Sequence, residues 1–346
     1  MTALATRAVP DAALRRPVTV RVAWLAVGLL VLAVLCVASV SFGVRDVTLP
    51  DIAAGLGGDT ATIESAAVVA RLPRTALALL VGAALALSGT TMQAITRNPL
   101  ADPGILGVSG GASLAVVIGI AFFALTDPYA TMAVAVVGAA IAAVFVYVVG
   151  SIGAGGATPL KLALAGAAAT AALMSLVSAV LLPRVEVMES FRFWQIGGVG
   201  GATWDRIGVV APVLLVGALI VLVCARGMNS LSLGDDVATS LGENVARTRL
   251  IAAAGAVILC GAATAVAGPI AFVGLVIPHT CRLLVGPDHR WLIPFTAVSG
   301  SALLVASDVI GRLVARPSEI EVGIITALIG APVFIAIVRR QRVREL

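Results

Sequence analysis

The stretch RLPRTALALLVGAALALSGTTMQAITRNPLADPGILGVSGG, residues 71–111, decides the fold. Two arginines, Arg71 and Arg74, open it on a predicted short loop, and an apolar run rich in Ala, Gly and Leu follows over 75–87. The small residues of this run let a neighbouring backbone approach closely, as helices in lipid require. The polar end of the stretch predicts irregular backbone, which membrane proteins tolerate only where it is buried, lines a cavity or meets water.

A charged start, a small-residue helix and a broken polar end together predict part of a translocation path. Discontinuous helices of this kind point to transport sites. A span followed by an ordinary turn is the alternative. The candidate path residues are Gly89, Gln93, Asn98 and Pro99.

The composition is that of a polytopic membrane protein. Hydrophobic residues make up 60% and charged residues 12% of the 346, whereas soluble domains carry roughly 25% charged residues. Long apolar runs without alternation favour helices over the strands of a transmembrane barrel. We therefore expect an all-α integral membrane protein with about ten transmembrane helices. The expected spans, each near the ~20 residues that cross a bilayer core, are 22–43, 75–96, 108–125, 129–150, 160–182, 205–225, 247–267, 270–285, 292–311 and 320–338.

The distribution of charge predicts the orientation. With the N-terminus in the cytoplasm and an even number of spans, the C-terminus is cytoplasmic too. Most of the 23 Lys and Arg residues then fall in inside loops, as the positive-inside rule requires. The chain thus divides into a cytoplasmic tail (1–21), a transmembrane permease domain (22–338) and a second cytoplasmic tail (339–346). A cleaved signal peptide at the start is the alternative, although its apolar core would be shorter.

The sequence shows no chemistry of its own. Its single lysine, Lys161, does not lie in a GxxxxGK[ST] pattern, so the chain has no phosphate-binding loop and ATP hydrolysis would need another chain. The four cysteines form no CxxC pair, and the two histidines show no metal-ligand spacing. We expect no catalytic residue, no metal site and no cofactor in this chain, with ATP and magnesium bound by a partner subunit.

The longest polar segment of the predicted inner face is LSLGDDVATSLGENVARTR, 231–249. Asp235 and Asp236 begin a short helical run, Ala238 lies within it, Gly242 ends it as a C-cap would, and Glu243 opens the next turn. A short helix at this place can dock in a groove of a soluble partner. A solvated connecting loop is the alternative.

Charged residues also gather at predicted outer span ends. Asp308 and Arg312 lie four residues apart on one helix face, where they can form a local ion pair. The functional interpretation adds Arg312 to Arg71 and Arg74 as an outward-facing positive set. Such a set attracts acidic side chains of an incoming protein.

Two further segments predict local structure. Residues 188–204 suggest a short interfacial helix with tryptophan anchors, because aromatic residues favour membrane interfaces. The pair Gly268–Pro269 and the residue Pro278 are expected to break helices.

Three stretches in order resemble the FecCD family, the permease subunits of type II ABC importers for ferric siderophores, haem and cobalamin. The first is RLPR with GAALALSGTTMQAITRNPLADPGILGVSGGA at 82–112, and the second is GPIAFVGLVIPHTCRLLVGPDHR at 268–290. The third is SALLVASDVIGRL with VGIITALIGAPVFIAIVRR, between 301 and 340. The resemblance extends from about Arg71 to the C-terminus.

This resemblance implies several partners in the inner (plasma) membrane of a bacterium. They are a second permease, either another copy or a paralogue, two ATP-binding cassette subunits inside and a substrate-binding protein outside. By motif, Arg71, Arg74 and Arg312 correspond to arginines that pair with binding-protein glutamates in the cobalamin importer. Segment 231–249 corresponds to the part that contacts the ATPase, with Gly242 at the family's glycine. The second and fifth spans line the family's central path.

The sequence departs from the family pattern at two places. Glu321 stands where the outer ELPVG motif commonly has proline, and Gly198 stands where the family often has serine. The first change lies close to the arginine set.

We therefore expect a permease subunit that works by alternating access, with a ferric siderophore as the first choice of substrate and haem or cobalamin as alternatives. An ion-coupled secondary transporter is the alternative from another class. It would need intramembrane carboxylates, for which Asp308 is the main candidate. A membrane enzyme lacks a catalytic cluster, and no nucleic acid partner is expected.

Overall fold

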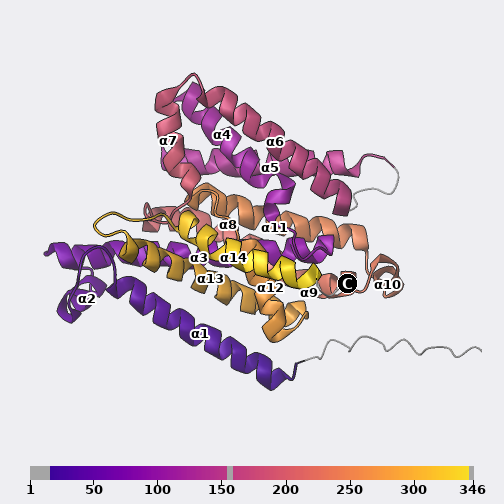
Figure 1. The fold of residues 1–346 in the computed structure, drawn as a ribbon, viewed down its shortest axis with the longest axis horizontal. Helices are drawn as coiled ribbons and strands as arrows, with labels where there is room; N and C mark the ends of the chain where they lie inside the picture. Colours follow the sequence, from indigo (N-terminus) through magenta and orange to yellow (C-terminus); the bar gives the residue numbers. More distant parts are fainter. Residues whose placement is uncertain (1–15, 154–158, 343–346) are drawn as a thin grey trace, which may run out of the picture.

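The computed structural model describes residues 16–153 and 159–342, and these residues form helices joined by short loops without a strand (Figure 1). Each predicted span coincides with an apolar helix. In chain order these are α1 (Val18–Ser41), α3 (Ile63–Thr96), α4 (Val108–Phe123), α5 (Pro128–Ser151), α6 (Pro159–Leu181), α8 (Trp204–Val223), α11 (Val245–Ala267), α12 (Val273–Val285), α13 (His289–Val314) and α14 (Val322–Arg342). Within the described ranges, 7 helices are long and apolar enough to cross a membrane, and α4, α12 and the apolar part of α14 are shorter. The all-α membrane fold is confirmed.

Short elements connect the long helices. They are α2 (Leu49–Leu56), the 3-10 helix η1 (Pro103–Leu106), α7 (Val185–Ile196), α9 (Ala225–Leu231) and α10 (Asp235–Ser240). Helix α7 covers the first part of the predicted segment 188–204, whereas Trp204 begins α8, and α10 is the short helix predicted within 231–249.

The start of α3 corrects the sequence-based picture. The helix begins at Ile63, so Arg71 and Arg74 lie within it and not on a loop, and Pro73 is an interior residue. Thr62 and Ser65 form a reciprocal cap at its N-terminus, in which the Ser65 N–H donates to the Thr62 hydroxyl. A well-capped start and the packing of surrounding helices outweigh the single hydrogen bond that the proline removes.

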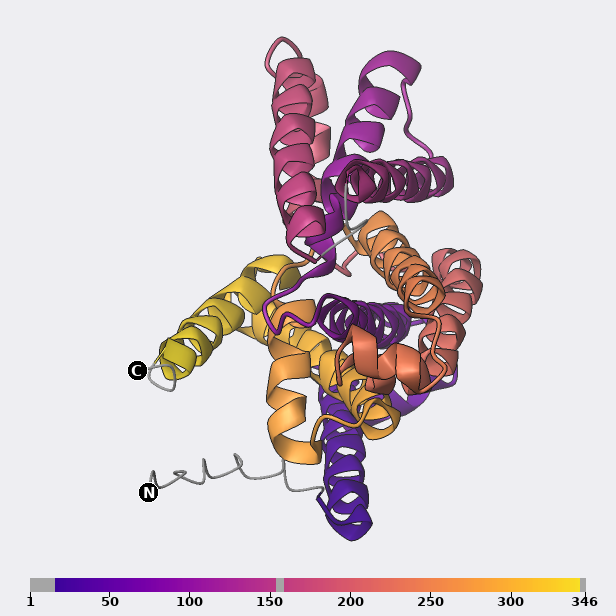
Figure 2. The ribbon, with the colours of Figure 1, turned by 90° about the vertical axis from the view of Figure 1, so that its right-hand side faces the viewer.

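Helix α3 is the core of the bundle. In its most apolar window 78% of residues are buried, compared with 6% for α1 and 17% for α6. Figure 2 shows α3 between the α4–α6 group and α1. A Cβ added to Gly82 would collide with the Gly300 carbonyl of α13, and one added to Gly89 would collide with the Gly274 carbonyl of α12. The small residues of α3 therefore allow close approach of neighbouring backbones, as predicted.

The bundle has two distinct ends. The first residues of α1, the last residues of α14 and the helix α10 lie together at one end, whereas α2 and α7 lie at the other (Figures 1 and 2). We call these the α10 end and the α7 end. The predicted tails fall mainly on 1–15 and 343–346, outside the described residues, and their remaining residues extend α1 and α14.

Candidate functional site

At the α7 end, a buried carboxylate joins α3 to α13. Asp308, which is 1% exposed, accepts from Arg74 Nε at 2.9 Å and lies 2.9 Å from Arg312 Nη2. Arg74 also reaches Glu319 Oε2 at 2.6 Å in the loop before α14. The predicted Asp308–Arg312 ion pair is thus present, and a second arginine from another helix completes it.

The other two arginines of the predicted docking set cap the end of α1. Arg71 Nη1 donates to the carbonyls of Val40 and Ser41, and Arg312 Nη1 donates to the carbonyls of Ser39 and Phe42. The last carbonyls of a helix have no partner within the helix, and basic side chains near its C-terminus satisfy them.

This capping shows how the arginines of the predicted outward-facing positive set are held. Arg71 is 7% exposed and Arg312 is 2% exposed. The structure brings both together with Arg74 at one end of the bundle, but their guanidinium groups face the protein. Their docking role remains a prediction, for which Arg74, bound to the half-exposed Glu319, is the best-placed member.

The two departures from the family pattern lie against each other. A Cβ placed on Gly198, in the loop after α7, would collide with the Glu321 carboxyl group. Burial raises the pKa of Glu321, and the Arg74 charge opposes this shift. Glycine at 198 therefore leaves the space that the longer side chain at 321 occupies. The contact could not be predicted because the two positions lie far apart in the chain.

Gln93, predicted to line a path, forms a bridge between α3 and α12. Pro278 lies inside α12 and does not break it, which corrects the expectation for this proline. Because proline has no N–H, the Gly274 carbonyl four residues earlier loses its helical donor. Gln93 Nε2 donates to this carbonyl at 3.3 Å and to that of Leu275 at 3.2 Å, and Gln93 Oε1 accepts from Arg282 Nη2 at 2.6 Å.

The other path candidates separate in space. Gly89 is buried at the crossing of α3 and α12. Asn98 is exposed in the loop that follows α3, where its side-chain oxygen accepts from the Leu100 N–H, and Pro99 is partly buried beside it. The irregular backbone predicted after α3 is present as this loop and η1. The structure places Gly89 and Gln93 in a helix contact, and their role in a path remains a prediction.

At the other end of the bundle, α10 is clamped to two long helices. Asp235 lies 3.3 Å from Arg97, the residue after α3, and 2.9 Å from Arg249 of α11. Ala238, within α10, is fully buried, and Gly242 follows the end of the helix with a φ of 84°. Glu243 accepts a hydrogen bond from the Thr248 hydroxyl, and Asp236 is exposed. The helical run and its glycine end are as predicted.

A set of exposed apolar residues on and beside α10 was missed by the sequence analysis. Leu233, Val237 and Leu241 are 60%, 46% and 64% exposed. Val237 lies in α10, Leu233 precedes the N-cap residue Gly234, and Leu241 is the C-cap residue. Three large apolar residues in a mostly polar segment were the available signal. We call these three residues the α10 apolar face.

The membrane-length helices around a buried core helix define the chain as a multi-pass membrane protein. The model of the FecCD transport family matches residues 30–340, and the chain belongs to this family.

Individual relatives match most of the chain. The chain is 45% identical over 317 residues to the ferric enterobactin transport system permease protein FepD of Escherichia coli (strain K12), covering 91% of this chain and 94% of that protein. It is 39% identical over 277 residues to the hemin transport system permease protein HmuU of Yersinia pestis, covering 79% of this chain and 82% of that protein. A solved structure of a metal-chelate type ABC transporter in an inward-facing conformation aligns with a TM-score of 0.80 at 30% identity, covering 91% of this chain and 98% of that one.

Proposed function

We propose that this chain is the permease subunit of an ATP-driven importer of a ferric siderophore, in the cell membrane of a bacterium. The observation that supports this most is the 45% identity to a ferric enterobactin permease over almost the full length of both proteins. The substrate moves by alternating access of a pore that this chain forms with a second permease, either another copy or a paralogue.

The α10 apolar face is the proposed contact with the ATPase. Full burial of a Leu or Val side chain stabilises a complex by about 1.5–3 kcal/mol, so burial of all three side chains would contribute strongly to the binding free energy. Asp235 then links α10 to Arg97 and Arg249. A displacement of α10 by the ATPase would therefore reach both α3, the buried core helix, and α11.

This contact can be tested with one charged substitution. Leu241→Asp should abolish ATPase association in pull-down from detergent, because a carboxylate in an apolar groove is poorly solvated. Leu56→Asp is the matched control, since Leu56 on α2 is 59% exposed at the opposite end. Gly242→Arg is a less clean test, because its φ of 84° strains any side chain. Normal association of Leu241→Asp would remove α10 as the docking site.

On the other side of the membrane, Arg74 is the proposed contact with a substrate-binding protein. An incoming carboxylate would compete with Glu319, which already holds Arg74. Glu319→Gln should therefore strengthen binding-protein association at low salt, with a smaller effect at high salt because exposed charges are screened. Unchanged affinity at low salt would count against this contact.

The substrate is tested by competition. With the ATPase and binding protein reconstituted in proteoliposomes, uptake of iron-55 as ferric enterobactin should exceed that of hemin and cobalamin. Hemin is the second candidate because HmuU is also a close relative. Preferred uptake of hemin or cobalamin would overturn the siderophore assignment and leave the permease role intact.

A further inference from the structure

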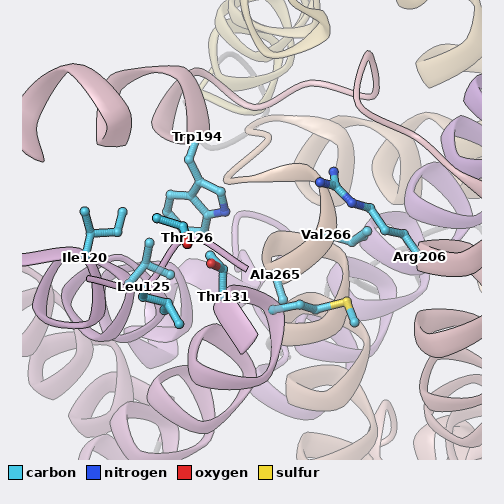
Figure 3. Close-up of a pocket in the computed structure, with 10 residues that line it drawn as sticks. Ile120, Leu125, Thr126, Thr131, Trp194, Arg206, Ala265 and Val266 are labelled. Atoms are coloured by element: carbon cyan, nitrogen blue, oxygen red, sulfur yellow. The ribbon is translucent and has the colours of Figure 1, made fainter. Parts of the chain in front are cut away.

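A cavity of about 460 Å³ at the α7 end serves neither of the proposed contacts (Figure 3). It lies among α4, α5, α7, α8 and α11. Much of its wall is apolar, with Val116, Ile120 and Met132 as examples, and Thr126, Trp194 and Arg206 supply polar groups. A concave site with apolar walls and a few convergent polar groups is the usual form of a ligand site.

Two hydrogen-bond donors converge on this cavity. The Trp194 indole enters from α7, and the Arg206 side chain extends toward it from the start of α8 (Figure 3). Trp194 Nε1 is buried and has no hydrogen-bond partner in the described protein. Buried polar groups are normally paired, so this N–H lacks the acceptor that it would be expected to have.

Arg206 is also incompletely used. Its Nη1 donates to the Gly201 carbonyl at 2.8 Å, and no ion pair to a carboxylate is found for it among the described residues. The guanidinium group has further donors in a planar fork that matches carboxylate and phosphate oxygens. The cavity therefore offers donors for an anionic oxygen group.

The charge of the walls sets the charge of the ligand. Among the described residues that line this cavity, Arg206 is the one that carries a charge. A smaller cavity of about 200 Å³ shares Trp194 and Arg206 as walls, and Glu321 is among its other lining residues. A group with a single negative charge is therefore complementary to Arg206, because a further negative charge would be near the Glu321 carboxyl group.

The surroundings are those of a lipid-facing surface. Ile141 and Val144 of α5 are 65% and 63% exposed, and Val209 and Leu215 of α8 are 47% and 60% exposed. These helices both border the cavity at their α7-end residues, and their exposed apolar faces extend along the bundle from there. Tryptophan at this level is typical of the membrane interface.

We propose that this cavity binds one phospholipid by its phosphodiester group. The phosphodiester bears a single negative charge, accepts from Arg206 and Trp194 Nε1, and leaves the acyl chains along the apolar walls and the exposed faces of α5 and α8. The bound lipid would fix α7 against α8, and its source is the surrounding bilayer.

The test is native mass spectrometry of the delipidated full chain in detergent, titrated with palmitoyl-oleoyl phosphatidylglycerol. The wild type should bind one lipid with saturation. Arg206→Gln should weaken this binding at least tenfold, and Trp194→Phe should weaken it about threefold, because each removes donors. Arg192→Gln is the matched control, since Arg192 is an exposed arginine of α7 that does not line the cavity.

Additional arms separate the possible ligands and guard against misfolding. Arg206→Lys retains the charge and should bind within about threefold of wild type, with an unchanged unfolding temperature. Dioleoylglycerol, which lacks the phosphate, should not compete, and neither should inorganic phosphate at millimolar concentration. Equal lipid affinity of wild type and Arg206→Gln, competition by dioleoylglycerol, or competition by inorganic phosphate would each overturn the proposal.

Discussion

Replacing Gln93 with leucine should destabilise the protein by about 2.5–6 kcal/mol, although leucine is similar in size. Gln93 is 3% exposed, and its amide is the donor that the Gly274 carbonyl receives in place of the missing Pro278 N–H. A buried carbonyl left without a donor costs about 1–3 kcal/mol. The Arg282 guanidinium also loses its acceptor at 2.6 Å, and a hydrogen bond to a charged group contributes about 1.5–3 kcal/mol.

The assay is equilibrium unfolding in mixed detergent–SDS micelles, followed by tryptophan fluorescence. Thr91→Val is the control, because Thr91 lies on the same helix, is fully buried and donates only to the Leu87 carbonyl of its own helix. Its cost should stay below about 1 kcal/mol.

Pro278→Ala provides the critical second mutation. Alanine supplies the backbone N–H that Gly274 lacks, so it should recover about 1 kcal/mol or more in the Gln93→Leu background and less in the wild type. The double-mutant cycle measures this difference directly. A Gln93→Leu cost within 0.5 kcal/mol of zero, or equal effects of Pro278→Ala in both backgrounds, would refute the bridging role.

Three other predictions concern single positions. Gly89→Ala should prevent close packing of α3 on α12 and sharply reduce folded yield. Gly208→Ala, where an added Cβ meets nothing within 4 Å, should be neutral. Size-exclusion profiles of the two variants provide the comparison, and equal profiles would contradict the close contact of α3 with α12 at Gly89. Asp308→Asn should cost about 3–5 kcal/mol in the same unfolding assay, because it leaves the buried Arg312 without its carboxylate and Arg74 with Glu319 alone. A loss under 1 kcal/mol would argue against a buried network. Glu321→Gln should raise stability slightly at neutral pH, by less than about 1 kcal/mol since the group is half-exposed. The gain should vanish below the ordinary pKa of 4.5, because a carboxyl group whose pKa is raised in the folded state lowers stability only as the pH rises from its ordinary pKa through its raised pKa. A gain that grows in acid would be inconsistent with the raised pKa.

The apolar helices were predictable from sequence because each is a long run of hydrophobic residues with polar ends. The start of α3 was not, because Arg71, Pro73 and Arg74 together look like a loop, although the Thr62 cap gave a local signal for an earlier start. Local patterns favour such an error when tertiary packing holds a proline inside a helix.

The candidate sites were predictable only in part. The short helix α10 and its glycine end follow from local sequence, and so does the Asp308–Arg312 pair. The tie between Gln93 and α12 depends on a proline 185 residues later in the chain, and the Gly198–Glu321 contact joins two loops. Burial of Arg71 and Arg312 likewise depends on where α1 ends in space. None of these long-range partners is encoded in spacing along the chain.

The central claim is that this chain conducts a substrate but draws its energy from a separate ATPase. The most direct measurement is substrate uptake and ATP hydrolysis in proteoliposomes that contain the chain alone, or the chain with its ATPase and binding protein. We predict ATP-dependent uptake only with the full set, and no hydrolysis by the chain alone. Accumulation of substrate or hydrolysis of ATP by the purified chain alone would contradict the account.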